Sequence, residues 1–281
     1  MDRLTLETSA KINLSIDVTG KRENGYHDVK LIFQEINLSD RISLSLQSNS
    51  GISVKSESPQ IPTGEKSLAY RAARAFLDEL GCDDGLQIEI VQRVPTGAGL
   101  GGGSADAAGV LNGLNALYGN PFPQDTLLKI GVKLGADIPF CIMGGCAVAE
   151  GIGEKLTPLP MPPKLHCVLA KPEASVSTKW VYEKFDTLRD LVHPEVDRVV
   201  DGIRNNDLYS ICRHAGNILE SVTVPAYPVV GWLKDAFQKA GAVLSLMSGS
   251  GSAVFGLFET LKDAKAAAEQ AKPFADKIFI V

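Results

Sequence analysis

The sequence predicts an α+β fold in two domains, and three features indicate this. Apolar and polar residues alternate through the first 56 residues, as is typical of strands. Helical periods then alternate with further strands along the rest of the chain. Residues 156–164 hold four prolines in nine positions, which predicts a linker. We therefore place one domain at residues 1–158 and the second at residues 159–281.

The first domain is predicted to combine an antiparallel sheet with helices. Strands are expected at residues 4–6, 12–18, 31–33, 42–46 and 52–54, with turns at Gly20, Gly25, Asn37 and Gly51. The apolar spacing then predicts a helix over residues 67–80, with Gly81 as its C-terminal cap. The remaining elements are a strand at 86–91, helices at 104–118 and 123–134, and strands at 146–149 and 155–156.

The second domain is predicted to have a ferredoxin-like core. Its strands are expected at residues 165–170, 243–247, 253–258 and 277–281. Its helices are expected at about 178–185, 195–204, 208–219, 229–240 and 261–271. Without the additional helices, this order is β-α-β-β-α-β.

Composition excludes several classes of protein. Hydrophobic residues make up 44% of the chain, enough for a packed core. The formal charge is −5 and no basic block occurs, which argues against a nucleic-acid binder. The chain shows no signal-peptide pattern, no apolar stretch of ~18 residues and no cysteine pair with metal spacing. We expect a cytoplasmic protein without membrane partners, either a monomer or a weak homodimer.

The segment from Pro95 to Ala108, PTGAGLGGGSADAA, is the strongest chemical signal. Five of the seven residues from Gly97 to Gly103 are glycine, and a helix is predicted to begin at Ser104. Glycines let backbone N–H groups approach an anion, and a helix N-terminus adds partial positive charge. A flexible turn is the alternative, but five glycines directly before a helix favour a phosphate site.

Two common phosphate motifs fit this segment poorly. A Walker loop would contain Gly-Lys-Ser/Thr, and the chain has no such string. Gly97, Gly99 and Gly102 do satisfy the dinucleotide-binding pattern G-x-G-x-x-G. That pattern should follow a buried strand of a parallel sheet, whereas the preceding LQIEIVQRV alternates as a half-exposed strand does. A dinucleotide-dependent oxidoreductase is therefore disfavoured.

Three ordered motifs resemble those of the GHMP kinases. PTGAGLGGGSADAA is similar to the family's phosphate-binding motif, Ser9-Ala-Lys-Ile-Asn-Leu14 to its first motif, and the glycine segment from Met247 to Gly256 to its third. The resemblance implies an N-terminal domain like domain 2 of ribosomal protein S5 and a ferredoxin-like C-terminal domain. It also implies ATP as the phosphoryl donor, with these nucleotide-binding residues: Pro95, Thr96, Gly97, Ala98, Gly99, Leu100, Gly101, Gly102, Gly103, Ser104, Ala105, Ser248, Gly249 and Gly251.

Finer features resemble one branch of this family, whose substrate is a cytidine diphosphate-linked methylerythritol. They include Asn24-Gly-Tyr-His27, Phe33-Gln34, Leu38-Ser-Asp40 and Gly135-Ala-Asp-Ile-Pro-Phe140. Two departures stand out: Asn24 replaces the more usual Asp, and Ala105 replaces a serine that commonly follows Ser104. The sequence identifies no metal ligands, and we expect ATP oxygens and Ser104 to hold Mg²⁺.

The resemblance assigns the catalytic roles to Lys11 and Asp137. By local sequence alone Lys11 reads as a solvated lysine at a strand end. Asp137 precedes Ile138-Pro139 and could equally cap a helix. By resemblance, Lys11 offsets charge on the transferred phosphoryl group and Asp137 takes the proton of the acceptor hydroxyl.

The resemblance also assigns four residues to the substrate. Tyr26 and Tyr182 are expected to sandwich the cytosine and His27 to hydrogen-bond its edge, while Asn13 contacts the methylerythritol hydroxyls or phosphate. The resemblance thus implies an ATP-dependent kinase that phosphorylates the C2 hydroxyl of this substrate in the non-mevalonate isoprenoid route. The alternatives are another kinase of the family, such as homoserine kinase, or a nucleotide-binding protein without catalysis.

Overall fold

The computed structural model describes residues 2–281, which form two compact units. The first unit comprises residues up to Lys11, Glu35–Thr96 and Gly101–Gly144. The second comprises Ile12–Gln34, Gly97–Leu100 and Gly145–Val281. Each unit is therefore assembled from separate stretches of chain. The domain boundary between residues 158 and 159 stays a prediction.

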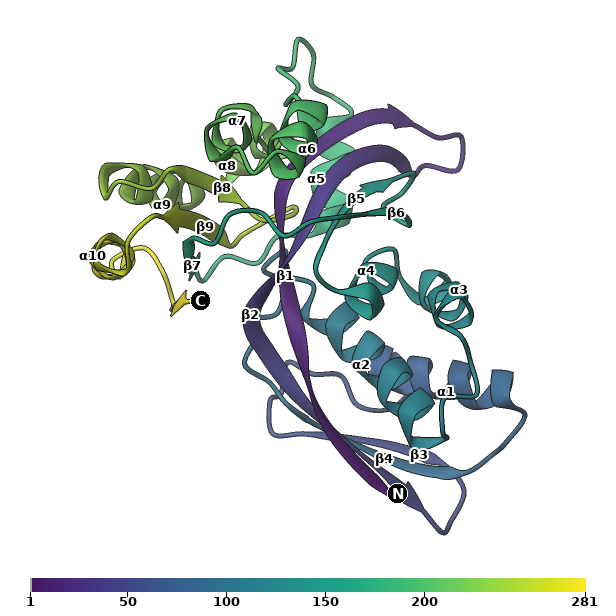
Figure 1. Ribbon diagram of the computed structural model, residues 1–281. Helices are drawn as coiled ribbons and strands as arrows, with labels where there is room; N and C mark the ends of the chain where they lie inside the picture. Colours follow the sequence, from purple (N-terminus) through teal and green to yellow (C-terminus); the bar gives the residue numbers. More distant parts are fainter. Residues whose placement is uncertain (1) are drawn as a thin grey trace. The chain divides into compact units, whose positions relative to one another are not determined.

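The first unit packs helices on one face of a sheet (Figure 1). Its helices are η1 (Gly64–Lys66), α1 (Leu68–Leu80), α2 (Gly102–Leu117), α3 (Gln124–Leu134) and α4 (Ile138–Met143). Its strands include β3 (Ile52–Ser56) and β4 (Gly85–Val91), which pair in parallel. Strand β4 also pairs antiparallel with residues 41–47 of β2 (His27–Gln47). Ile42 and Ile88 from the sheet meet Phe76 and Leu111 from the helices in one buried core.

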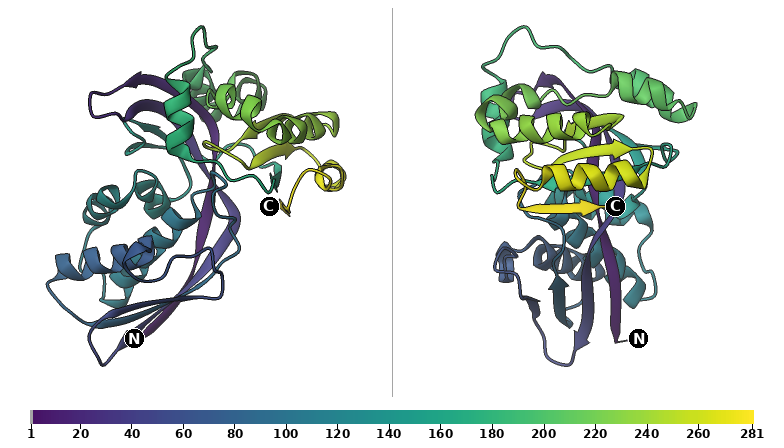
Figure 2. Two further views of the ribbon diagram at one scale, coloured as in Figure 1. Left: turned by 180° about the vertical axis from the view of Figure 1, so that it is seen from behind. Right: turned by 90° about the vertical axis from the view of Figure 1, so that its left-hand side faces the viewer.

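The second unit contains the ferredoxin-like sheet, whose strand order is β10-β7-β9-β8 and whose pairings are all antiparallel. These strands are β7 (His166–Lys171), β8 (Leu244–Met247), β9 (Val254–Phe258) and β10 (Lys277–Ile280). Helices α9 (Pro228–Lys239) and α10 (Leu261–Ala271) cover the sheet (Figure 2). The predicted α+β class and the β-α-β-β-α-β order are confirmed.

Other elements of the second unit complete the framework. Strand β1 (Arg3–Lys21) enters it at Ile12, and residues 31–34 of β2 pair with β5 (Cys146–Glu150), which pairs with β6 (Lys155–Leu159). The additional helices are α5 (Thr178–Phe185), α6 (Val196–Arg204), α7 (Leu208–His214) and α8 (Glu220–Ala226).

The N-terminal strands are confirmed as strands but not as separate short ones, and the linker is wrong in its start. The short strands expected at 4–18 and 31–46 are continuous parts of β1 and β2. Asn37 forms no turn: it is an exposed position between buried Ile36 and Leu38, so the alternation runs through it unbroken. The expected linker begins too early, because residues 155–159 form β6 despite Pro158. Proline is tolerated in strands at sheet edges, and β6 is such an edge.

The helix predicted over residues 208–219 is also wrong in extent, because α7 ends at His214. The segment that follows pairs with Ile16 of β1 through two backbone hydrogen bonds. The Ile16 N–H donates to the Gly216 carbonyl at 2.8 Å, and the Ile218 N–H donates to the Ile16 carbonyl at 3.1 Å. Backbone pairing with a distant strand thus overrides the helical spacing. The short helix α8 was not predicted, and α4 was considered only as the helix that Asp137 could cap.

Gly109 permits α2 to pack against β1, and we predict that Gly109→Ala destabilises the protein. A Cβ at this position would lie 2.2 Å from Thr8 Cγ2. We expect a loss of about 1–3 kcal/mol in the free energy of unfolding, measured by urea denaturation. Gly103→Ala in the same helix is the control, because its Cβ would meet nothing closer than 3.7 Å. It should be neutral or stabilising, by up to about 1 kcal/mol. A neutral Gly109→Ala would contradict this account of the packing.

Candidate active site

Lys11 and Asp137 form an ion pair within the first unit. Lys11 Nζ lies 3.4 Å from Asp137 Oδ2, and the two side chains are 5% and 37% exposed. Strand β1 supplies the lysine, and the residue immediately before α4 supplies the aspartate. A buried ammonium without a counter-charge is costly, so the carboxylate offsets the burial of Lys11. The two residues assigned from the family motifs therefore meet.

Asp137 occupies the N-cap position of α4, but its side chain does not cap the helix. Its backbone is helical rather than extended, and its side chain makes no capping hydrogen bond. Pro139 in the first turn also removes one N–H that a cap could bind. The carboxylate is directed to Lys11 instead, which favours the functional interpretation over the capping one.

The second half of the glycine segment starts helix α2 beside Lys11. Gly101 has a left-handed backbone with φ +72°, and a Cβ there would lie 3.1 Å from Lys11 Cε. The first helical hydrogen bond runs from the Ala105 N–H to the Gly101 carbonyl at 2.8 Å. The N–H groups of residues 102–104 therefore have no acceptor within the helix and can receive an anion. This backbone is compatible with the predicted phosphate site, which stays a prediction.

The first half of the glycine segment contacts the third motif within the second unit. Ser248 Oγ donates to the Gly99 carbonyl at 2.9 Å, and the Ala253 N–H donates to the Ala98 carbonyl at 3.2 Å. A Cβ on Gly99 would fall 2.0 Å from the Ser248 carbonyl oxygen, so only glycine permits this approach. The Asn13 N–H also donates to Ser248 Oγ, at 3.3 Å. Hydrogen bonds thus connect residues that are predicted to bind nucleotide with one that is predicted to bind substrate.

Side chains from neighbouring segments hold the loop between β8 and β9 in place. Asn217 Nδ2 donates to the carbonyls of Met247 and Gly249, both at 2.8 Å. Thr223 Oγ1 donates to the Ser250 carbonyl at 3.2 Å. These bonds give three backbone carbonyls a hydrogen-bond partner and fix the loop's backbone.

A buried polar cluster lies beneath the glycine segment in the first unit. Asp40 accepts the backbone N–H groups of Arg93 at 2.5 Å and Val94 at 2.7 Å, just before Pro95. Thr8 Oγ1 donates to Asp106 Oδ1 at 3.0 Å and also lies 3.3 Å from the Asp40 carbonyl. Burial, with a further contribution from the Asp40 charge, raises the pKa of Asp106 to about 7. Burial also raises the pKa of Asp40, against the lowering effect of its two N–H donors.

A second polar cluster surrounds His27 in the second unit. His27 Nε2 lies 2.7 Å from Asp186 Oδ1, and Lys21 Nζ lies 2.6 Å from Asp186 Oδ2. The hydrogen bond from Lys21, followed by that from His27, lowers the pKa of Asp186. Tyr182 stacks on the imidazole with ring centroids 4.8 Å apart. His27 is thus held on one edge and covered on one face.

Tyr26 is placed differently from the other predicted substrate residues. It lies 60% exposed in the turn between β1 and β2, where its N–H donates to Asn24 Oδ1 at 3.1 Å. The observed ring partner of Tyr182 is His27. The expected sandwich of a base between Tyr26 and Tyr182 stays a prediction.

Asp40, Asp106 and Asp186 contact segments of the candidate site and were not assigned from the sequence. Asp186 follows Tyr182 by four residues, a spacing that puts both on one side of a helix. That spacing could have indicated that Asp186 lies near Tyr182. The link between Thr8 and Asp106 joins residues 98 positions apart, and no local pattern predicts it.

Two features that residues 2–281 lack bear on cofactors and membranes. No group of three or more His, Cys, Asp or Glu side chains there is arranged to hold a metal ion. Nor does any helix in that range combine the length and apolar character needed to cross a membrane.

Two family models match the chain. The model of the GHMP kinases N terminal domain matches residues 67–145, and the model of the GHMP kinases C terminal matches residues 199–276. Together they flank the predicted linker and include both glycine-rich motifs.

Curated relatives match over the full length. A protein of Lachnoclostridium phytofermentans named 4-diphosphocytidyl-2-C-methyl-D-erythritol kinase is 43% identical, covering 100% of this chain and 97% of the relative. A protein of the same name from Caldicellulosiruptor saccharolyticus is 42% identical, covering 99% and 96%.

Solved structures of two kinases also resemble this chain. A crystal structure of 4-(cytidine 5'-diphospho)-2C-methyl-D-erythritol kinase matches with a TM-score of 0.83 and 33% identity, covering 99% of this chain and 98% of that one. Homoserine kinase from Cytophaga hutchinsonii matches with a TM-score of 0.80 at 22% identity, covering 100% and 94%. At that identity the second match shows the fold alone.

The raised pKa of Asp106 predicts a pH-dependent stability that Asp106→Asn removes. The folded protein keeps a proton that the unfolded chain loses above its ordinary pKa of 3.8. Stability from this group therefore falls as the pH rises from about 4 to about 7, and it stays low above that. The free energy of unfolding is measured in urea for Asp106→Asn and for the wild type. The difference between them should change by about 2–3 kcal/mol in favour of the variant as the pH rises from 5 to 8. Exposed Glu57→Gln is the control and should show no such gain. An equal response of the two variants would contradict the assignment.

Proposed function

The chain belongs to the GHMP kinase family, and on this basis we propose that it transfers the γ-phosphoryl group of ATP to the 2-hydroxyl of 4-diphosphocytidyl-2-C-methyl-D-erythritol. The full-length relatives support the substrate. The observation that carries the chemistry is the ion pair of buried Lys11 with Asp137, 3.4 Å apart. The product is the 2-phosphate of the substrate, an intermediate of the non-mevalonate isoprenoid route.

The two alternatives have less support. The match to homoserine kinase shows only the shared fold, whereas relatives above 40% identity carry one other name. A nucleotide-binding protein without catalysis has no need to bury a lysine against a carboxylate at considerable cost. Both features favour the kinase.

The residues proposed to bind nucleotide belong to the two glycine segments, residues 95–105 and 248–251. The N–H groups of residues 102–104 would bind phosphate oxygens at the start of α2, where the helix dipole favours negative charge. Mg²⁺ fits a site in which ATP supplies most ligands and Ser104 supplies a hydroxyl, because this ion is commonly held through substrate phosphates and water. When bound, the ion would offset charge on the phosphates.

Asp137 and Lys11 are proposed to serve the chemical step. The acceptor is a tertiary alcohol, whose pKa is far too high for a carboxylate to deprotonate it in the ground state. Phosphoryl transfer passes through a loose transition state in most analyses, so positioning and charge stabilisation matter most. Asp137 orients the hydroxyl and takes its proton as the new P–O bond forms. Lys11 holds the carboxylate in place and offsets charge on the transferring group.

His27 and Asp186 are proposed to select cytosine. A neutral imidazole that donates through Nε2 to Asp186 presents Nδ1 as an acceptor. The exocyclic amino group of cytosine can donate to such an acceptor, whereas uracil carries a carbonyl at the same position. Tyr182 and Tyr26 would supply aromatic faces to the base, and Asn13 would contact the methylerythritol hydroxyls or phosphate. This arrangement favours cytidine over uridine.

A direct assay tests the proposed reaction. The protein should consume ATP with 4-diphosphocytidyl-2-C-methyl-D-erythritol and show no comparable turnover with homoserine or mevalonate. Product identity is checked by mass spectrometry and ³¹P NMR. Absence of turnover with the cytidyl substrate would end the proposal.

Asp137→Asn should separate catalysis from binding. The variant keeps the shape and a hydrogen bond but removes the base. We expect kcat to fall by roughly 10²–10⁴ with KM for both substrates little changed, because the lost contact acts in the transition state. Steady-state kinetics and a thermal melt of the same sample give the two readouts. Near-full kcat with a lowered Tm would mean that Asp137 is a structural helix-start residue.

His27→Ala and Asp186→Ala should both erode the preference for the cytidine substrate over its uridine analogue. Each removes the oriented Nδ1 acceptor, one directly and one by releasing the imidazole. We expect the kcat/KM for the cytidine substrate, divided by that for the uridine analogue, to drop about tenfold, which corresponds to the loss of one hydrogen bond. Lys30→Met, which removes a different ion pair of the second unit, the one with Asp197, is the control. Unchanged selectivity in His27→Ala would count against this recognition.

A further inference from the structure

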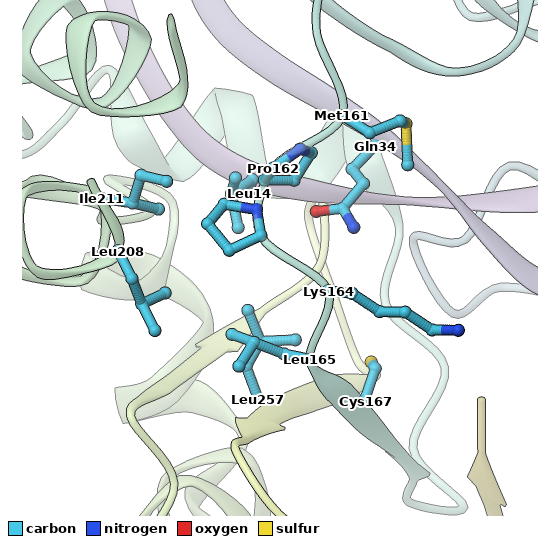
Figure 3. Close-up of a pocket in the computed structure, with 11 residues that line it drawn as sticks. Leu14, Gln34, Met161, Pro162, Lys164, Leu165, Cys167, Leu208, Ile211 and Leu257 are labelled. Atoms are coloured by element: carbon cyan, nitrogen blue, oxygen red, sulfur yellow. The ribbon is translucent and has the colours of Figure 1, made fainter. Parts of the chain in front are cut away.

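Lys171 is a buried lysine outside the roles assigned above. It is only 8% exposed and stands at the end of β7, which lies between β9 and β10 in the sheet. Strand β7 begins beside an apolar cavity that Leu165, Cys167 and Leu257 help to line (Figure 3), and it ends at Lys171. The Asp276 N–H donates to the Lys171 carbonyl at 2.8 Å. The sheet therefore holds the backbone from which this lysine extends.

The Lys171 ammonium donates to two backbone carbonyls of the segment that follows β7. Its Nζ lies 2.5 Å from the Pro172 carbonyl oxygen and 2.8 Å from that of Ala174. Burial lowers the pKa of Lys171, and the charges of Asp276 and Glu173 offset only part of this effect. Because burying a cation is costly, an apolar side chain of similar size would serve better as mere core packing. The two hydrogen bonds therefore indicate that the ammonium shapes this segment.

The same segment, residues 172–177, contacts both glycine-rich segments within the second unit. Ser252 Oγ, from the third motif, donates to the Ala174 carbonyl, which thus accepts a hydrogen bond from each side. Ser175 lies against Gly97, where an added Cβ would fall 2.9 Å from Ser175 Oγ. The backbone that Lys171 holds is therefore in contact with both segments that are proposed to bind nucleotide.

Helix α5, which follows this segment, has anchors of its own. Val181 is fully buried, and Tyr182 stacks on His27. Asp186, directly after the helix, is ion-paired with Lys21. These contacts hold the residues proposed to recognise cytosine without help from Lys171. A change at Lys171 should therefore affect the nucleotide more than the cytidyl substrate.

We propose that Lys171 is a positioning residue for ATP binding. By holding the backbone of residues 172–175, it keeps Gly97 and the loop between β8 and β9 in the conformation that receives the nucleotide. It acts through this backbone and not by touching ATP. This role rests on the proposed kinase function, since ATP is the ligand that the two glycine-rich segments are proposed to bind.

Lys171→Met tests the role, because methionine is apolar and similar in length but cannot donate the two hydrogen bonds. We expect the KM for ATP to rise about tenfold, which corresponds to the loss of about one net hydrogen bond. The kcat and the KM for the cytidyl substrate should change little. Lys277→Met is the matched control, because Lys277 is exposed on β10 directly beside Lys171 in the sheet register. It should leave both KM values unchanged.

Nucleotide binding without turnover separates this role from the proposed reaction. Isothermal titration calorimetry with AMPPNP, a non-hydrolysable analogue of ATP, should show the same tenfold loss of affinity in Lys171→Met, as about one net hydrogen bond would give. Wild type that binds AMPPNP but does not phosphorylate the cytidyl substrate would end the proposed reaction and leave this test intact. Wild type that does not bind AMPPNP would end both.

Ser252→Ala tests the same connection with a smaller change and decides the matter if Lys171→Met fails to fold. It removes the second hydrogen bond to the Ala174 carbonyl and should also weaken AMPPNP binding. The role of Lys171 is overturned if folded Lys171→Met binds AMPPNP as the wild type does, or if it loses only Tm and kcat. It is also overturned if Lys277→Met gives the same loss, or if Lys171→Met is unfolded and Ser252→Ala leaves the affinity unchanged.

Discussion

The buried charge of Lys11 is the constraint on which the proposed active site depends. A lysine that is only 5% exposed requires a carboxylate nearby, and Asp137 provides it from the start of α4. The same side chain limits the backbone beside it, because a Cβ at Gly101 would meet the Lys11 stem at 3.1 Å. Charge compensation and the glycine backbone at the start of α2 are therefore coupled through one residue within the first unit.

The supporting layers show how this geometry is maintained. Asp40 fixes the chain just before the glycine segment by accepting two backbone N–H groups, and Thr8 links the Asp40 region to Asp106. In the second unit, Asn217 and Thr223 perform a similar task for the loop after β8. Buried polar side chains thus fix the backbone conformation of both glycine-rich segments, as is expected where donors must be positioned in advance of a ligand.

Local sequence signals predicted much of this arrangement. The helix over residues 68–80 with its Gly81 cap, the glycine segment before α2 and the ferredoxin-like strand order all follow from spacing and turn chemistry. The long-range contacts were not predicted from the sequence. Asn37 is a typical turn residue and concealed the length of β2, although the alternation runs through it. Backbone pairing of residues 216–218 with Ile16 ended a predicted helix early. The support of His27 by Asp186 spans 159 positions, and the spacing of Asp186 from Tyr182 does not by itself pair it with His27.

Lys11 and Asp137 are proposed to act as one catalytic unit, and this is tested by a double-mutant cycle. The kcat of Lys11→Met, Asp137→Asn and the double variant would be compared with that of the wild type under saturating substrates. The account predicts that the double variant is scarcely slower than the slower single variant, because each change already removes the shared function. Losses that simply multiply would show that the two residues act independently and would contradict the account.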